Sequence, residues 1–426
     1  MNTTDCTTTP VAGPTAVTCS REAVPQFHYA PLYWLAVGTF AVGTEGFMIA
    51  AILPRIATDL FVSVQAAGQF VTIFAFTYAV SSPVLTALTG GFDRRKLLIL
   101  SMSAFVAANL AAAWSQHFWS LAGARILIAA FAGLYVPGAN ALAGALAPSE
   151  RRGRALAIVS GGISLAVALG VPLGAFIGNR FGWRMNFIGV AGLAVIALVG
   201  LLFGLPKGIG EGLVTASLRE RIAVARQPSA LFALCVTTLW AVGTYSVFTY
   251  IALFLATVVG LKGAAIGYAL FLWGVAAFIG LLLGGLANDR IGSRRVIFAT
   301  LSVMALALMS LTLVAHFLDQ STRLVPVLIA VVIWGLTAWG FFPAQQSRLI
   351  GITGLKGTAI ILSLNASFMY LGFSFGAAAG SFVLTEGNVT DLGWVGGLWV
   401  VSSLTLFILS DGRTKQLQTT RTNENK

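Results

Sequence analysis

The sequence predicts an all-α membrane protein in which 12 transmembrane helices form two pseudo-symmetric bundles of six. Three observations support this fold class. Of the 426 residues, 57% are hydrophobic and only 9% are charged, with a mean hydropathy of +0.88, whereas roughly 25% of the residues of a soluble domain are charged. Apolar runs long enough to cross a bilayer recur twelve times. Short motifs of the first half return in the second half about 200 residues later.

The expected helices follow from the apolar runs, taken in chain order. Each run holds about 20 apolar or small residues, the length at which a helix spans the hydrocarbon core. We expect an N-terminal bundle at 32–205, with helices at 32–54, 67–89, 97–115, 119–145, 155–178 and 186–205. We expect a C-terminal bundle at 231–410, with helices at 231–258, 265–287, 295–317, 325–344, 357–384 and 391–410.

Three polar segments complete the expected domain organisation. Residues 1–31 are rich in Thr, Pro and Ala and contain no long apolar run, so they are predicted to form a disordered cytoplasmic tail. Residues 206–230 are predicted to form a cytoplasmic central loop between the two bundles, and residues 411–426 a second cytoplasmic tail.

Lysine and arginine positions predict the orientation of the chain. With both termini in the cytoplasm, the cytoplasmic segments hold 20 of the 26 basic residues and the outer loops hold five. Membrane proteins carry such an excess of Lys and Arg in their cytoplasmic loops. The net charge of +12 is therefore explained without nucleic acid, and none is expected as a partner. We expect a multi-pass protein of the cell inner membrane that contacts the lipid bilayer.

Cysteine and histidine positions argue against a metal site and against a membrane-embedded enzyme. Cys6, Cys19 and Cys235 lack the spacing of metal ligands, so no metal, cofactor or structural disulfide is expected. The three histidines lie in the N-terminal tail or at predicted outer helix ends. They therefore form no nucleophile–base cluster within the membrane, and we do not expect an enzyme.

Glu45 is the one acidic residue that we can place at membrane depth, in the middle of the first predicted helix. An ionised carboxylate is costly at the bilayer centre, so such residues line a polar cavity, pair with a cation or take up a proton. A proton-coupling carboxylate in a transporter is the favoured interpretation. The alternative is a tolerated glutamate that is hydrogen-bonded between helices.

Three pairs of motifs indicate that the two halves arose by internal duplication. The pairs are Gly-Thr-Glu at 43–45 with Gly-Thr-Tyr at 243–245, the glycine ladder in 170–178 with that in 372–380, and the arginines at 94–95 with those at 294–295. All three recur at nearly one offset. We therefore expect the two bundles to be related by pseudo-symmetry.

The segment between the eighth and ninth predicted helices reads GLANDRIGSRR at 285–295. It resembles the loop signature of the major facilitator superfamily, and the chain resembles in particular its twelve-helix drug/proton antiporter group. The resemblance implies that the glycines allow close helix contact and that Asp and Arg form a charge relay in gating. The residues that carry it are Gly285, Asp289, Arg290, Gly292 and Arg294.

The first-half copy of this loop signature, at 86–95, departs from the family pattern. Arg94 and Arg95 are present, but Thr86, Gly90 and Gly91 stand where Gly, Asp and Arg are expected, and Asp93 is a candidate substitute for the aspartate at a shifted position. This departure leaves the fold assignment intact and puts the usual cytoplasmic gate of the first half in doubt.

The fifth predicted helix contains GVPLGAFIG at 170–178, which resembles the antiporter signature of proton-driven exporters. Gly170, Gly174 and Gly178 form a flat stripe for a neighbouring helix, and Pro172 is expected to introduce a kink. The alternative is ordinary packing of small residues. The following Gly-Trp-Arg at 182–184 makes the resemblance more specific.

Arg125 lies within the fourth predicted helix, where a membrane arginine needs a partner or water. The resemblance implies that helices 1 and 4 both line the central cavity, so that Glu45 and Arg125 meet across it. The alternative is an arginine near the outer membrane face that reaches toward headgroups.

The second half is expected to supply most of a substrate cavity. Its aromatic and amide side chains suit a neutral, planar or weakly polar ligand, although helix packing and interfacial belts are an alternative explanation for many of them. The candidate lining residues of both halves are Tyr135, Asn140, Trp240, Thr244, Tyr245, Trp334, Trp339, Gln345 and Asn365. The arrangement resembles the branch that exports purine nucleosides, sugars or chloramphenicol.

These features together predict a proton-coupled efflux transporter that exports a small organic compound by alternating access, with Glu45 and Arg125 as the coupling pair. The expected partners are the substrate and protons, and the expected state is a monomer. Two alternatives share the fold: a proton-linked uptake symporter and a transport-dead membrane sensor. A channel is disfavoured because one Glu and one Arg form no ring of pore charges.

Overall fold

The computed structural model describes residues 29–148, 151–206 and 216–424, and gives the backbone alone for 355–356 and 411–424. Most of the predicted N-terminal tail, with Cys6 and Cys19, and part of the predicted central loop lie outside the described residues. Within the described ranges the regular structure is helical, and 12 helices there are long and apolar enough to cross a membrane. The predicted all-α membrane fold is confirmed.

The first half contains six membrane-spanning segments. They are α1 (Ala30–Asp59), α2 (Val64–Leu88), α3 (Arg94–Ala113), α4 (Phe118–Leu146), the continuous α5 (Arg152–Leu165), η2 (Ala166–Gly170) and α6 (Val171–Phe181), and α7 (Arg184–Gly204). The η2 turn is a π-helix directly before Val171 and Pro172. Since proline lacks an N–H group, the change in helical pitch at this point agrees with the predicted irregularity.

The second half contains six further segments, preceded by the short helix α8 (Leu218–Ala225). They are α9 (Pro228–Phe248) with α10 (Ile251–Phe254) and η3 (Leu255–Val259), α11 (Ala264–Ile291), α12 (Ser293–Phe317), the two segments of α13 (Leu324–Glu386), and α14 (Leu392–Glu424) after η4 (Val389–Asp391). The two segments of α13 meet at Gly354, where φ is 68°. Glycine adopts this left-handed conformation without steric cost.

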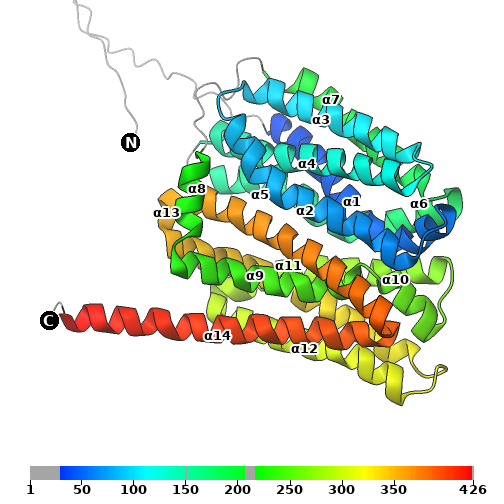
Figure 1. The fold of residues 1–426 in the computed structure, drawn as a ribbon. Helices are drawn as coiled ribbons and strands as arrows, with labels where there is room; N and C mark the ends of the chain where they lie inside the picture. Colours follow the sequence, from blue (N-terminus) through cyan, green and yellow to red (C-terminus); the bar gives the residue numbers. More distant parts are fainter. Residues whose placement is uncertain (1–28, 149–150, 207–215, 425–426) are drawn as a thin grey trace, which may run out of the picture.

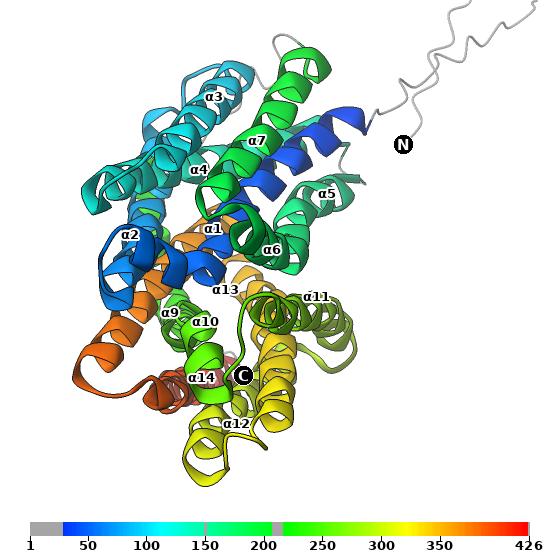
Figure 2. The same cartoon turned by 90° about the vertical axis from the view of Figure 1, so that its right-hand side faces the viewer.

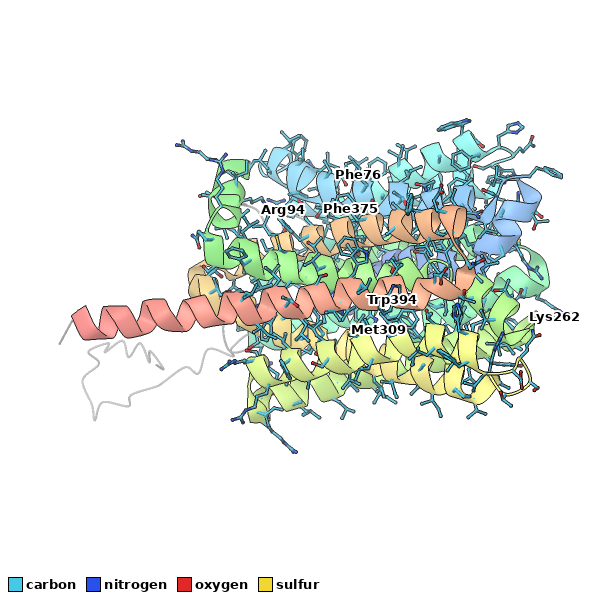
Figure 3. The ribbon with its side chains drawn as sticks, turned by 60° about the horizontal axis from the view of Figure 1, so that its bottom comes forward. Phe76, Arg94, Lys262, Met309, Phe375 and Trp394 are labelled. Atoms are coloured by element: carbon cyan, nitrogen blue, oxygen red, sulfur yellow. The ribbon has the colours of Figure 1, made fainter. Side chains whose placement is uncertain are left out.

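The helices of each half gather on their own side of the molecule, as the ribbon views show (Figures 1 and 2). Helices α2 and α13 lie side by side at the seam between the two halves. Arg94 lies at one end of the helical bundle and Lys262 at the other (Figure 3). We call these the Arg94 end and the Lys262 end.

Both halves use a ladder of glycines to bring two helices into close contact. A Cβ atom on Gly174 would lie 2.6 Å from Met48 Cβ, and one on Gly376 would lie 2.6 Å from Val242 O. Such contacts are too short for any side chain, so only glycine permits the observed packing. The ladders dock η2 and α6 on α1, and the second segment of α13 on α9, so the two halves repeat the same helix contact.

The packing changes the register of the repeat in the first helix of each half. Gly174 faces Met48, whereas its counterpart Gly376 faces Tyr245. Tyr245 therefore occupies the place of Met48 in its own half, and not the place of Glu45 that the sequence offset predicted. The shift amounts to roughly one helical turn.

Candidate functional site: a buried ion pair at the contact between the halves

Glu45 of α1 and Arg125 of α4 form an ion pair in which Arg125 Nη1 donates to Glu45 Oε1. Both side chains are completely buried. Arg125 Nε also donates to the carbonyl oxygen of Phe70 at 3.3 Å, and its guanidinium carbon lies 4.3 Å from the ring centroid of Phe74. The arginine is thus paired inside the bundle, in contrast to the alternative of an arginine that reaches toward the headgroups.

The pair leaves one acceptor and one donor without a protein partner. Glu45 Oε2 and Arg125 Nη2 are both buried, and neither forms a hydrogen bond within the described residues. Because an unsatisfied buried polar atom is costly, such atoms are expected at sites where a proton, water or ligand group binds. The geometry therefore allows a proton or a ligand to bind without displacing the backbone contact of Arg125.

Aromatic side chains from both halves surround the ion pair. Tyr78 of α2 stacks on Tyr370 of α13 with ring centroids 3.8 Å apart, and Tyr245 of α9 stacks on Phe373 at 3.6 Å. Tyr370 interacts electrostatically with Glu45, and Tyr245 does so with Arg125. The charged pair of the first half therefore lies beside phenol groups of the second half.

Sequence reasoning missed the contribution of α2 to this site. Phe70, Phe74 and Tyr78 follow one another at intervals of four residues, a spacing that places side chains on one face of a helix. This aromatic stripe was the available signal. It was indistinguishable from lipid-facing aromatics until the structure placed Arg125 against it.

The hydrogen bonds between the halves, within the described residues, lie toward the Lys262 end. They are Gln65 Nε2 to Leu384 O at 3.0 Å, Gln69 Nε2 to Ser381 Oγ at 3.3 Å, Ser381 Oγ to Gln65 O at 3.2 Å, Ser374 Oγ to Thr72 O at 3.0 Å and Asn179 Nδ2 to Gly263 O at 3.2 Å. Four of these bonds lie on the Lys262 side of the ion pair, and the Ser374–Thr72 bond lies level with it, because Phe70 and Phe74 on either side of Thr72 contact Arg125.

Among the predicted cavity residues, Trp339 and Tyr245 lie near the contact between the halves. Trp339 meets Phe47 of α1 edge-on, with ring centroids 5.8 Å apart. Tyr135 instead packs beside Gly38 and donates to Leu35 O at 3.3 Å, and Asn140 accepts a hydrogen bond from Ser160 at 3.0 Å. These last two contacts lie within the first half.

Two of the predicted tryptophans, Trp240 and Trp334, are buried in an aromatic cluster of the second half. Trp240 stacks on Phe341 at 5.0 Å, and its backbone carbonyl accepts a hydrogen bond from the Thr244 hydroxyl. Trp334 lies 5.6 Å from Trp273, measured between ring centroids. The indole nitrogens of Trp240, Trp273 and Trp334 are buried without a hydrogen-bond partner in the described residues.

Gln345 and Asn365 form a separate polar network. Gln345 Nε2 donates to Ala233 O at 2.7 Å and to Thr237 Oγ1 at 3.0 Å, and Thr237 Oγ1 donates to Asn365 Oδ1 at 2.7 Å. The network joins α9 to both segments of α13. It lies within the second half, and the structure does not bring it into hydrogen-bond contact with the ion pair.

The glycine motif at 170–178, which lies in η2 and α6, places its glycines along α1 on both sides of Glu45. A Cβ on Gly170 would lie 3.0 Å from Thr44 Cα, and Gly178 O accepts a hydrogen bond from Arg55 Nη1 at 2.7 Å. Beyond the ladder, Asp59 Oδ2 accepts from Trp183 Nε1 at 2.9 Å and pairs with Arg184 at 3.2 Å. The end of α1 therefore contacts the Gly-Trp-Arg segment at 182–184.

The two loops that carry the predicted gating residues differ between the first and the second half. Asp93 caps α3 by accepting from Lys96 N at 3.0 Å, and Arg94 Nη2 donates to Gly90 O at 2.9 Å. Arg95 donates to the carbonyl oxygens of Leu202 and Leu205 at the end of α7.

In the second half, Gly292 ends α11 with φ at 83°, a left-handed conformation that glycine favours. Asp289, Arg290 and Arg294 around it are exposed, and a Cβ on Gly285 would meet no atom within 4 Å. The gating role of these residues stays a prediction.

Comparisons with known proteins agree with this architecture. The family model described as Major Facilitator Superfamily matches residues 35–377. The chain is 33% identical to the uncharacterized MFS-type transporter YbcL of Bacillus subtilis (strain 168), over 89% of this chain and 95% of the relative.

It is 32% identical to the inner membrane transport protein YdhP of Escherichia coli (strain K12), over 91% of this chain and 97% of the relative. It is 31% identical to a chloramphenicol resistance protein of Streptomyces lividans, over 88% and 94%. Members of this family are transporters and not enzymes. The protein therefore belongs to the Major Facilitator Superfamily and is a multi-pass membrane transporter.

Proposed function

We propose that the protein is a proton-coupled exporter of a small, neutral or weakly polar organic compound. The observation that carries the proposal is the buried Glu45–Arg125 ion pair at the contact between the two halves. Carboxylates inside membrane proteins commonly serve as proton carriers. In the proposed cycle, Glu45 binds a proton from outside and releases it toward the cytoplasm while the two bundles rock about the site.

Arg125 is proposed to balance the two states of Glu45. When Glu45 takes up a proton, the ion pair is lost, but Arg125 retains the Phe70 carbonyl and the Phe74 ring as partners. These contacts limit the cost of leaving a buried guanidinium without its carboxylate. A substrate group that donates a hydrogen bond to Glu45 Oε2, which has no partner in the described residues, would stabilise the carboxylate and so favour release of the proton.

The proposed topology places both termini and the Arg94 end in the cytoplasm of a cell with an inner membrane. The support is the concentration of arginines at this end, including the 94–95 and 294–295 pairs. With this orientation, the hydrogen bonds between the halves close the outer side of the transporter. Such an arrangement corresponds to an inward-facing or occluded state. A monomer is proposed to suffice for transport.

The proposed substrate carries a planar or aromatic group. The support is the set of rings from both halves beside the ion pair, in particular the stacked Tyr78–Tyr370 and Tyr245–Phe373 pairs, because aromatic faces bind planar ligands well. The Streptomyces lividans relative is named for chloramphenicol resistance, so amphenicols are the first compounds to test.

The remaining candidate residues are proposed to act around this centre. Trp339 and Tyr245 would line the substrate site directly, whereas Tyr135, Asn140, Trp240, Thr244, Trp334, Gln345 and Asn365 would shape it through the packing described above. The two loops at the Arg94 end and the glycine ladder on α1 would set how the halves move.

Substrate-induced proton movement in proteoliposomes tests the proposal. With a pH dye in a pre-acidified lumen, an exported amphenicol should alkalinise the lumen, and Glu45→Gln should abolish this signal while substrate binding persists. Glu386→Gln is the matched control, because it makes the same chemical change at an exposed position and should leave transport intact. Undiminished proton-driven export by Glu45→Gln would contradict the assignment.

The same assay separates the alternatives. Accumulation of the compound in the direction of proton flow would identify an uptake symporter. Binding of the compound without flux in either direction would identify a membrane sensor. Either result would overturn the proposed export while leaving the family assignment unaffected.

A further inference from the structure

The short helix α8 lies outside the twelve membrane segments, at the Arg94 end of the bundle. In Figure 1 it runs across the ends of the long helices and not along them, so it lies roughly in the plane of the membrane surface. It contacts α2 of the first half and α9 and α13 of the second half. The helix therefore crosses the seam between the halves.

The local sequence specifies where α8 begins. Ser217 Oγ accepts a hydrogen bond from Glu220 N at 3.3 Å, and Ser217 N donates to Glu220 Oε2 at 2.7 Å. This reciprocal capping box satisfies the free N–H groups of the first turn. The short helix is thus a defined element of the fold.

One face of α8 is fixed against the second half. Arg221 is 5% exposed and donates to Ser363 Oγ at 2.8 Å and to Ala216 O at 3.3 Å. Burial lowers the pKa of this guanidinium from its ordinary value. Val224 and Ala225 pack on a small apolar cluster that α9 and α13 supply. Rotation of α8 about its own axis is therefore prevented.

The opposite face of α8 combines exposed apolar and cationic side chains. At about 100° per residue, Leu218, Ile222, Arg226, Arg219 and Ala223 follow one another around one side of the helix. Leu218 and Ile222 are 42% and 44% exposed, respectively, and both arginines are exposed. The five residues line a shallow surface depression.

We propose that this face of α8 binds an anionic phospholipid of the cytoplasmic leaflet. A phospholipid matches both the cationic and the apolar part of this face, since its phosphate pairs with Arg219 and Arg226 and its acyl region covers Leu218 and Ile222. Inorganic phosphate would leave the apolar side chains uncovered. A lipid bound here would hold α8 across the seam and, through the bond between Arg221 and Ser363, would contact the second segment of α13.

Lipid retention by the whole purified protein tests this site. Native mass spectrometry after detergent exchange, with phosphatidylglycerol or phosphatidylcholine added, should show preferential retention of phosphatidylglycerol. Near a membrane surface each basic residue contributes about fivefold to the binding of anionic lipid, so Arg219→Gln/Arg226→Gln should lower retention by roughly 25-fold. The matched control Arg151→Gln/Arg152→Gln removes two exposed arginines at the same end and should change retention much less.

The depth of the apolar side chains provides a second readout that does not depend on the arginines. A bimane label on Ile222→Cys, with the native cysteines replaced by serine, should be quenched by lipids that carry a nitroxide near the headgroup, more strongly in phosphatidylglycerol vesicles than in phosphatidylcholine vesicles. Quenching by an aqueous quencher alone would overturn the proposal. Equal retention of phosphatidylglycerol by Arg219→Gln/Arg226→Gln and the wild-type chain would also overturn it.

Discussion

The two halves of the molecule use the same packing device around different chemistry. In each half a ladder of three glycines lets one helix approach another: Gly170, Gly174 and Gly178 face α1, and Gly372, Gly376 and Gly380 face α9. Beside the first ladder lies the buried Glu45–Arg125 ion pair. Beside the second lie the stacked rings of Tyr245 and Phe373, and no ion pair is found between described residues of that half.

This difference shows that the backbone contacts are more alike in the two halves than the side chains at the centre. Close helix packing favours glycine at both ladders, because a Cβ at every ladder position except Gly170 would overlap a neighbouring atom. The central positions face the contact between the halves and escape this constraint. Under the proposed function, the first half carries the charge that couples to protons and the second half supplies the surface that recognises the substrate.

Removal of one partner of the ion pair has the largest expected effect, because it removes the feature that distinguishes the first half from the second. Arg125→Met leaves the Glu45 carboxylate buried without a cation, and breaking a buried pair in this way costs about 3–5 kcal/mol. Thermal unfolding in detergent should show the loss. Glu45→Gln/Arg125→Met contains no unpaired charge and should regain most of the stability, so a double variant as unstable as Arg125→Met would contradict the role of pairing.

Alanine substitutions in the two glycine ladders test how tightly the helices pack in each half. A Cβ on Gly372 would lie 2.5 Å from Thr238 O, whereas one on Gly170 would lie 3.0 Å from Thr44 Cα. Gly372→Ala should therefore cost about 1–3 kcal/mol by overpacking, and Gly170→Ala should cost less. Thermal unfolding in detergent measures both, with Gly285→Ala as the control because its Cβ would meet no atom within 4 Å. Equal losses at Gly372 and Gly285 would contradict the packing argument.

A hydrogen bond across the seam, level with the ion pair, tests how firmly the halves are held closed toward the Lys262 end. Ser374→Ala removes the bond to Thr72 O, whose net value is about 0.5–1.5 kcal/mol, and should raise the population open at this end by about two- to tenfold. Electron spin resonance distances between labels on Thr58→Cys and Thr322→Cys would report the change. Ser402→Ala, which removes a bond within α14, should leave the distances unchanged.

The smallest expected effect concerns the phenol groups of the second half. Tyr245→Phe keeps the ring that stacks on Phe373, so the free energy of unfolding should change by less than about 0.5 kcal/mol, whereas Tyr245→Leu should lose about 0.5–1.5 kcal/mol with the stack. Thermal unfolding separates these cases. A large loss in Tyr245→Phe would mean that the phenol, and not the ring, matters beside Arg125.

The membrane-spanning segments, their number and the position of the charged residue at membrane depth could be predicted from the sequence alone, because these are local properties. Hydropathy over about 20 residues identifies a spanning helix wherever it later packs. The isolation of Glu45 at membrane depth was visible in the same way, since it needed only the position of one residue within one apolar run. The family resemblance then implied Arg125 as its partner.

Which other side chains contact one another at the candidate site depends on the tertiary structure and could not be predicted from the sequence. The α2 stripe of Phe70, Phe74 and Tyr78 becomes part of the site because α2 packs beside α4 and α13. Similarly, Gln345 and Asn365 belong to a network with Thr237, away from the ion pair. These outcomes depend on how helix faces that are far apart in the chain fit together, and that fit depends on shape complementarity that no local pattern of hydropathy encodes.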